Sequence, residues 1–165
     1  LKDGTSTYFM AWTTTPWTLP GNAALAVNPE AQYVLVQSDS AGENPKKIIS
    51  ILAKDLVEIV YGEVKYEIVG ELKGSDLVGS EYIPVFNTYL EKEFKHKENA
   101  WKVYAGDFVT DTDGTGIVHI APAFGDDDMK LAQANNIPVV KHVLPNGTFA
   151  PEEITSSPFS TIASN

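Results

Sequence analysis

Cysteine is absent from the 165-residue sequence, so disulfide bonds and thiolate metal sites are excluded. The redox compartment stays open, because a cysteine-free chain is compatible with any of them. No run of apolar residues approaches the roughly 18 that a membrane span needs, and no leader-like segment follows Leu1. We therefore expect a soluble fragment of a longer protein that does not bind a membrane and that folds by packing alone.

Arginine is absent as well. All 12 basic residues are lysines, and with 22 acidic residues they leave a net charge of −10. Affinity for nucleic acid depends largely on neutralising phosphates, and arginine supplies a bidentate grip on phosphate that lysine lacks. Tight binding of nucleic acid by this chain alone is therefore not expected.

Length and composition predict one globular domain over residues 1–150. With 43% hydrophobic residues the chain is long enough for one sizeable core and too short for two. The segment 151–165 contains many serines and threonines and few large apolar side chains, which predicts an exposed exit segment.

Short runs of aromatic and β-branched residues predict a fold made mainly of strands. Helices are expected only over Lys54 to Tyr61, before Gly62, and over Asp126 to Asn135, after Gly125. This pattern predicts a mixed α/β fold that is mainly β, an antiparallel or mixed β-barrel with a few short helices. The expected strands are Tyr8–Thr13, Gln32–Gln37, Lys47–Leu52, Tyr66–Gly70, Tyr82–Phe86, Trp101–Thr110, Gly116–Ala121 and Pro138–Val143.

One stretch with chemical potential runs from Ala11 to Pro20, where a strand leads into three threonines, two prolines and two tryptophans. Because proline disfavours a helical conformation in the residue before it, Thr15 is expected to stay extended. The bland interpretation is a strand edge that ends at proline. The functional interpretation is a pocket in which the hydroxyls bind a ligand and the tryptophans stack on a base.

A second such stretch runs from Asp113 to Asp128. The turn at Asp113 and Gly114 leads into a strand whose one polar side chain is His119, and Gly125 then opens the second helix. Carboxylates in a first helical turn satisfy free N–H groups and oppose the macrodipole, which accounts for one or two of the three aspartates 126–128. The third leaves room for a functional role.

Several other chemistries fit the sequence poorly. In the calcium-loop frame set by Gly114, the first and last ligand positions fall on Val109 and Ile120, which excludes calcium. The three histidines are too scattered for a helical zinc motif, and no serine nucleophile elbow or phosphate-binding loop is present. We therefore expect no metal site and no cofactor in this chain.

The two stretches, in this order, resemble the two signature regions of the editing domain inserted in the class I aminoacyl-tRNA synthetases for isoleucine, valine and leucine. The run from Trp12 to Asn22 is most similar to the isoleucine version, since the other two typically carry arginine after two threonines. The segments Gly114 to Pro122 and Ala24 to Pro29, and the residues Gly125 and Asp128, also match. The resemblance covers 40 to 50 residues.

The resemblance implies a β-barrel-like editing domain and assigns roles by position. Asp128 would bind the substrate's α-ammonium group, and Thr13, Thr14 and Thr15 would contact the terminal adenosine and the amino acid. These four residues are the expected catalytic set, and Trp12, Trp17 and His119 would complete the substrate-binding pocket.

The implied activity is hydrolysis of Val-tRNA(Ile) by a cytoplasmic, monomeric isoleucyl-tRNA synthetase, with valyl-adenylate as an open second substrate. The partners would be the 3′ end of aminoacylated tRNA and, in cis, the rest of the synthetase. The synthetase's catalytic domain would use ATP and Mg²⁺, but its signature motifs are absent here, so this chain should not activate amino acids. Two alternatives remain: a valyl-tRNA synthetase editing domain that clears threonine, and a non-catalytic module that binds a nucleotide or peptide.

Overall fold

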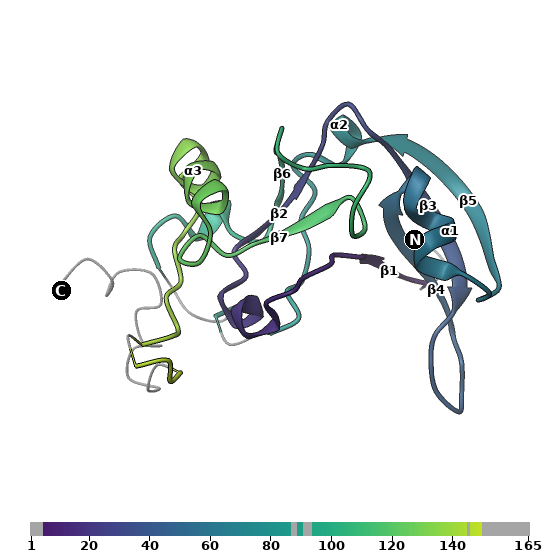
Figure 1. Ribbon diagram of the computed structural model, residues 1–165, viewed down its shortest axis with the longest axis horizontal. Coiled ribbons are helices and arrows are strands. Elements are labelled where there is room, and N and C mark those ends of the chain that lie inside the picture. Colours follow the sequence, from purple (N-terminus) through teal and green to yellow (C-terminus); the bar gives the residue numbers. More distant parts are fainter. Residues whose placement is uncertain (1–4, 87–88, 91–93, 145, 150–165) are drawn as a thin grey trace. The chain divides into compact units, whose positions relative to one another are not determined.

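A computed structural model describes residues 5–86, 89–90, 94–144 and 146–149, so the expected exit segment 151–165 lies outside the described residues. Figure 1 shows the helices and strands of the chain, which divides into two compact units by its internal contacts. Unit 1 comprises Leu1–Thr13, Ala26–Val78 and Tyr104–Val118, and unit 2 comprises Thr14–Leu25, Gly79–Val103 and His119–Asn165. No helix within the described residues is long and apolar enough to cross a membrane.

Unit 1 contains a four-stranded sheet in the order β1-β4-β3-β5. Strand β1 pairs parallel with β4, whereas β3 pairs antiparallel with both β4 and β5. The strands predicted near these positions are confirmed, although β1 ends four residues earlier than expected. Their bounds are Ser6–Phe9 (β1), Gln32–Asp39 (β3), Lys47–Ala53 (β4) and Tyr66–Lys73 (β5).

One helix packs on this sheet. After the 3-10 turn Lys54–Leu56, α1 (Val57–Tyr61) buries Val57 and Tyr61 against strand residues that include Val34 and Leu52. The helix ends at Gly62, whose φ of 52° is easily reached only by glycine. The predicted helix over residues 54–61 is thus confirmed as a short turn followed by one α-helical segment.

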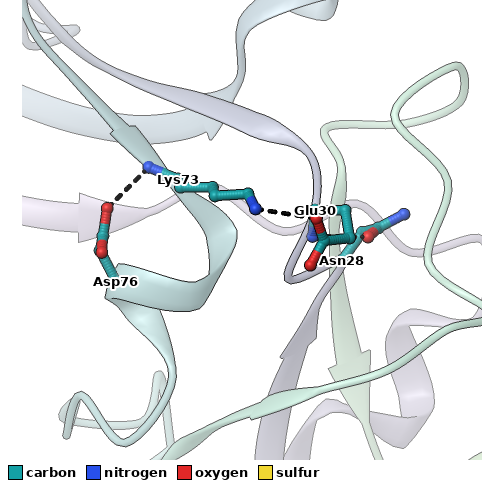
Figure 2. Close-up of polar contacts among 4 residues, drawn as sticks. All are labelled: Asn28, Glu30, Lys73 and Asp76. Carbon is teal, nitrogen blue, oxygen red and sulfur yellow. Dashed lines mark hydrogen bonds and ion pairs between the residues drawn. The ribbon is translucent and has the colours of Figure 1, made fainter.

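Polar contacts fix the start of a second helix, α2 (Gly74–Leu77), at the end of β5. The backbone N–H of Lys73 donates to the Asp76 carboxylate at 2.9 Å, and the Lys73 ammonium pairs with Glu30 at 2.8 Å (Figure 2). Glu30 in turn donates its N–H to the side chain of Asn28 at 3.0 Å. These contacts bring Gly74 against the backbone carbonyl of Asn28, where no Cβ fits.

A three-stranded sheet follows the order β6-β2-β7, with bounds Val103–Ala105, Ala24–Val27 and Ile117–Ile120. Each of these strands has residues in both units. Every residue of β2 is buried, so its sequence lacks the polar alternation that marks a strand, and it was not predicted. The predicted strand over residues 101–110 is confined to Val103–Ala105. Trp101 adopts a positive φ of 54° before it, and a turn closed by the bond from the Val109 N–H to the Gly106 carbonyl follows it.

Unit 2 contains the 3-10 helices η1 (Pro16–Gly21) and η3 (Lys97–Asn99) and the helix α3 (Asp126–Asn135), which was predicted with these bounds. Its core cluster joins Tyr89, Ala100, Trp101 and Val140. The predicted strands over residues 82–86 and 138–143 are wrong. Only isolated bridges form nearby, between Glu81 and Lys102 and between Val143 and Phe149.

The prediction of a mainly β fold with few short helices is confirmed. Within the described ranges the strands form two open sheets rather than one closed barrel. The single domain expected over residues 1–150 stays a prediction.

The close approach at Gly74 gives a stability prediction. An ideal Cβ at Gly74 would lie 1.9 Å from the carbonyl oxygen of Asn28, whereas at Gly70, in β5, the nearest atom would be Leu35 Cδ1 at 3.4 Å. Gly74→Ala should therefore lower the free energy of unfolding by more than about 2 kcal/mol, whereas Gly70→Ala should change it by less than about 1 kcal/mol. Urea denaturation measures both, and similar values for the two variants would contradict this packing.

Candidate functional site

The threonine-rich stretch ends in η1, which Pro16 begins. Proline suits a first helical position because its missing N–H has no partner there in any case. The carbonyl of Thr15 accepts the N–H of Thr18 at 2.9 Å and the Thr18 hydroxyl at 2.8 Å. Thr14 and Thr15 are exposed, and Trp17 is 56% exposed, so these side chains face solvent, whereas Thr18 is buried.

The structure assigns the predicted site residues to both units. Thr14, Thr15, Trp17, His119 and Asp128 belong to unit 2, whereas Trp12 and Thr13 belong to unit 1. Trp12 is 61% exposed, forms a parallel bridge with Val118, and lies against Gly114, where a Cβ would approach its side chain to 3.0 Å.

His119 is hydrogen-bonded through both ring nitrogens and only 8% exposed. Its Nε2 lies 3.0 Å from the Thr18 hydroxyl, and its Nδ1 lies 2.9 Å from the Asn22 amide nitrogen. Because Thr18 also bonds to the Thr15 carbonyl, a continuous chain of hydrogen bonds links Asn22 to Thr15 through the imidazole. The lone polar residue of the predicted strand is therefore a fully bonded histidine.

One carbonyl fixes the direction of every bond in this chain. The carbonyl of Ala24 can only accept, so the Asn22 atom 2.9 Å from it is the amide nitrogen. The same nitrogen donates to His119 Nδ1, which leaves the imidazole proton on Nε2. His119 Nε2 therefore donates to Thr18, whose hydroxyl donates onward to Thr15.

The imidazole of His119 is neutral over the physiological pH range. Its pKa is lowered to about 4, mainly because the charged ring would lose its hydration on burial and also because His142 lies nearby. A neutral ring is required here, since Nδ1 must accept the Asn22 donor. The site thus holds histidine as a fixed donor and acceptor rather than as a cation.

Asp128 lies in the first turn of α3, half-buried. One carboxylate oxygen accepts the Ala121 backbone N–H at 2.9 Å. Burial raises the pKa of this carboxyl, while the N–H bond from Ala121 acts in the opposite direction. Gly125 permits this position, because a Cβ there would lie 3.0 Å from the Asp128 carboxyl carbon.

The other two aspartates of this turn have different surroundings. Asp127 is exposed and pairs with Lys130 at 2.8 Å, and Asp126 is exposed. The residue at the N-cap is Gly125, and no side chain caps the helix. Helix-start capping therefore does not explain these aspartates, and both exposed carboxylates lie beside the positive end of the helix without a cap bond.

The end of β7 connects the two stretches that the sequence singled out. His119 bonds to Thr18 of the first and to Asn22 just after it. The Ile120 carbonyl accepts the Ala23 N–H at 2.9 Å, and the Ala121 N–H donates to Asp128 of the second. Three consecutive residues thus tie η1 and the start of α3 to one strand end. All of these residues belong to unit 2.

Sequence reasoning missed four residues that build this arrangement. Thr18 lies inside the first stretch, and Asn22 ends the run that resembles the editing domain, but neither carried an assigned role. Tyr82 donates its hydroxyl to Asn22 Oδ1 at 2.6 Å, and the buried His142 donates Nε2–H to the Trp17 carbonyl at 2.8 Å. No local pattern marks these two, because their partners lie 60 and 125 positions away in sequence.

Among the residues that the structure describes, no group of three or more histidine, aspartate or glutamate side chains is arranged to hold a metal ion. The site's polar groups are hydroxyls, amides, a neutral imidazole and one carboxylate. Such a set suits hydrogen bonding to a polar organic substrate and charge pairing with one cationic group.

No family model matches the chain. Curated relatives are isoleucine–tRNA ligases: that of Clostridium kluyveri is 48% identical over 145 residues, covering 88% of this chain and 13% of the relative. That of Bacteroides fragilis is 41% identical over 174 residues, covering 94% and 14%. A probable cytoplasmic isoleucine–tRNA ligase of Dictyostelium discoideum is 39% identical, covering 85% and 13%.

Solved structures show the fold. The crystal structure of GlLeuRS-CP1 matches with a TM-score of 0.63 at 20% identity, covering 79% of this chain and 45% of that one. The editing domain of the cytosolic leucyl-tRNA synthetase of P. falciparum matches with a TM-score of 0.58 at 17% identity, covering 78% and 46%.

The chain spans about 13% of the length of the curated relatives that it matches. Over that span the chain is 48% and 42% identical to two of them, and the fold is the one that editing domains adopt. The chain therefore belongs to the isoleucine–tRNA ligases, as a segment with the fold of a synthetase editing domain.

Proposed function

We propose that this chain hydrolyses misacylated Val-tRNA(Ile), as the editing segment of an isoleucyl-tRNA synthetase. One observation carries the proposal: the end of β7 binds both the Thr18–His119–Asn22 hydrogen-bond chain and the carboxylate of Asp128. The strand end thus anchors η1, beside the exposed Thr14 and Thr15 that would bind the ester, and holds an anionic partner for an amine. An aminoacyl ester carries a polar ester group and a cationic amine, which match these two features of the site.

In this proposal Asp128 binds the α-ammonium group of the substrate. Its carboxylate is half-buried, and one backbone N–H stabilises one of its oxygens, which leaves acceptor capacity for an ammonium donor. Burial disfavours the bare anion, as the raised pKa indicates. A cationic ligand offsets that cost and forms a charge-assisted hydrogen bond, so the substrate amine is the group that this position selects.

The hydrolytic step needs neither a covalent nucleophile nor a metal. A water oxygen bonds to the ester carbonyl carbon, and the tetrahedral intermediate then breaks its bond to the ribose oxygen, which takes the proton that the water gives up. The products are free valine and tRNA. Because the ester is already reactive, the chain's contribution is to hold the ester in place and to stabilise the oxyanion, through backbone N–H groups and the hydroxyls of residues 13–15.

A second site of this kind answers a limit on selectivity. One missing methylene changes the free energy of binding by roughly 1 to 3 kcal/mol. The isoleucine enzyme is itself a known example, since it discriminates isoleucine from valine by about 150-fold. A cavity that admits valine and excludes isoleucine by size removes the residual errors. In this proposal Trp17, His119 and Thr15 line that cavity, with Trp12 as a further contact for the nucleotide.

The proposed partners follow from the fact that the segment spans only about 13% of the length of its relatives. The remainder of the synthetase, in cis, would hold most of the tRNA and deliver its 3′ end, since this chain carries a net charge of −10 and no arginine. ATP and Mg²⁺ would serve that remainder, and the segment itself would use no cofactor. The enzyme would act as a monomer in the cytoplasm, and valyl-adenylate remains a proposed second substrate.

Removing the Asp128 carboxylate tests the proposal. In the full-length synthetase, Asp128→Ala should lower the deacylation rate of Val-tRNA(Ile) at least about tenfold, taking roughly 1.5 kcal/mol as the low end for a charge-assisted bond. The matched control is Asp127→Ala, whose carboxylate is exposed and pairs with Lys130, and which should leave the rate nearly unchanged. Deacylation of Val-tRNA, Ile-tRNA and Thr-tRNA is followed with each protein.

Three results would contradict the assignment in different ways. Equal rates for Asp128→Ala and wild type would remove the ammonium site. Preferential clearance of Thr-tRNA would favour the valine-type enzyme, and binding of tRNA without any turnover would favour a non-catalytic module.

Truncation of His119 tests the size filter. If the imidazole forms the wall that the extra methylene of isoleucine would strike, His119→Ala should create hydrolysis of Ile-tRNA in the full-length enzyme. A purely structural ring predicts instead a loss of roughly 1 to 3 kcal/mol in stability, with slower Val-tRNA hydrolysis and unchanged selectivity. His142→Ala is the matched control, because this second buried histidine of unit 2 also bonds to the first stretch.

The lowered pKa of His119 predicts how stability depends on pH. An unfolded histidine titrates near 6.5, whereas folded His119 titrates at about 4, so only the unfolded state gains a proton between these values. The contribution of His119 is fully present above about pH 6.5 and falls by about 3 kcal/mol as the pH drops to about 4. Urea denaturation of wild type and His119→Gln across this range should show a shallower pH dependence in the variant, and parallel curves would be inconsistent with a buried neutral ring.

A further inference from the structure

We propose that Tyr82 and Trp101 are positioning residues that clamp Asn22 and, through it, hold the imidazole of His119 in one tautomer and orientation. The catalytic consequence rests on the proposed editing function, whereas the structural consequence stands without it. Neither residue belongs to the two stretches that the sequence singled out, and both lie in unit 2 with Asn22 and His119.

Every polar group of Asn22 has a partner. Its side-chain oxygen accepts the Tyr82 hydroxyl at 2.6 Å, and its backbone carbonyl accepts the indole N–H of Trp101 at 3.2 Å. Its backbone N–H donates to the Leu19 carbonyl at 3.0 Å, and its amide nitrogen donates to Ala24 and His119. Tyr82 and Trp101 thus supply the two donors, one to the side chain and one to the backbone.

The two clamp residues also bind each other. The backbone N–H of Tyr82 donates to the carbonyl of Trp101 at 3.0 Å, and the N–H of Trp101 donates to the Ala23 carbonyl at 2.7 Å. Trp101 therefore contacts the backbone of Ala23 and of Asn22, while Tyr82 bonds to both Trp101 and Asn22. The result is a closed ring of hydrogen bonds around Asn22.

The backbone of Trp101 is strained in a way that marks a functional constraint. Its φ of 54° is a left-handed conformation that a bulky side chain adopts rarely and at a cost. The conformation is held by the core cluster of Tyr89, Ala100 and Val140 around the buried indole. Such strain persists where the surroundings over-determine the geometry, and here the geometry directs the indole N–H at Asn22.

The clamp acts on the site through a defined path. The Ala24 carbonyl selects the amide nitrogen of Asn22, and the Tyr82 hydroxyl, which donates to the amide oxygen, holds the amide in that orientation. The amide nitrogen then fixes Nδ1 of His119 as an acceptor, and Nε2–H is left to donate to Thr18. The Thr18 hydroxyl donates to the carbonyl of Thr15, the last of the three consecutive threonines 13–15. Without the Tyr82 hydroxyl, the amide oxygen loses its donor, and among the described residues the Ala24 carbonyl is then the one side-chain contact that opposes rotation of the amide.

The test is Tyr82→Phe, which removes one hydroxyl and keeps the ring. The control is Tyr8→Phe, in the exposed strand β1 of unit 1. The ¹⁵N chemical shifts of the His119 imidazole, measured in this chain at neutral pH, report the tautomer. Wild type and Tyr8→Phe should show a protonated Nε2 and an unprotonated Nδ1, whereas Tyr82→Phe should shift both resonances toward the average of the two tautomers.

A kinetic measurement in the full-length synthetase completes the test. The Val-tRNA deacylation kcat should fall about tenfold in Tyr82→Phe, the equivalent of one hydrogen bond of ordinary strength, with KM little changed. Wild-type imidazole shifts in folded Tyr82→Phe would overturn the clamp whatever the activity. Absence of Val-tRNA hydrolysis by the wild-type synthetase would instead refute the proposed function and leave the tautomer result to decide on the clamp.

Discussion

The hydrogen bond from the Asn22 amide to Nδ1 of His119 is the constraint on which the rest of the site depends. A buried imidazole has two tautomers, and each would point a different set of donors and acceptors at its neighbours. Because the Ala24 carbonyl can only accept, Asn22 presents nitrogen to His119, and the proton stays on Nε2. The direction of the Thr18 hydroxyl and its hold on the Thr15 carbonyl follow from that choice.

Burial favours the neutral form of both His119 and Asp128, so it shifts their pKa values in opposite directions. Burial keeps His119 neutral, and it makes the anionic form of Asp128 costly without a partner. Among the described residues, the hydrogen bond that the Asp128 carboxylate accepts comes from the backbone N–H of Ala121 and not from a cationic side chain. A carboxylate in this setting gains more from an incoming ammonium group than an exposed one would, because less water competes for it. Asp127, which is exposed and already paired with Lys130, offers no such gain.

How far the sequence predicts this structure depends on whether the signal is local. The start of helix α3 was predictable to the residue because Gly125 precedes it and acidic residues fill its first turn. Strand β2 was not, because a fully buried Ala-rich strand has no alternation to recognise. Trp101 looks like a strand residue by composition, yet its tertiary contacts hold it at a positive φ.

The candidate site divides in the same way. Asp128 and His119 stand out in the sequence as an unexplained third aspartate and as a lone polar residue in an apolar strand. Their contacts do not, since Asn22 lies 97 positions from His119 and 60 from Tyr82. A hydrogen bond between residues so far apart in sequence depends on how the chain folds back on itself, and a single sequence carries no pattern that predicts it. The assignment of roles therefore came from the family resemblance rather than from spacing.

The charge of the chain limits how this site can obtain its substrate. The chain has 12 lysines and 22 acidic residues. Several of the lysines form ion pairs, among them Lys47 with Asp39, Lys54 with Glu71 and Lys73 with Glu30. A surface of net charge −10 repels a polyanion at long range, yet at physiological ionic strength that repulsion is screened beyond about 8 Å. In the proposed function, a tRNA body anchored elsewhere on a longer protein would bring a single-stranded 3′ end to the site, where short-range hydrogen bonds and the Asp128 carboxylate act. The weak affinity that the composition imposes on the isolated segment is thus compatible with selective chemistry on a delivered ester.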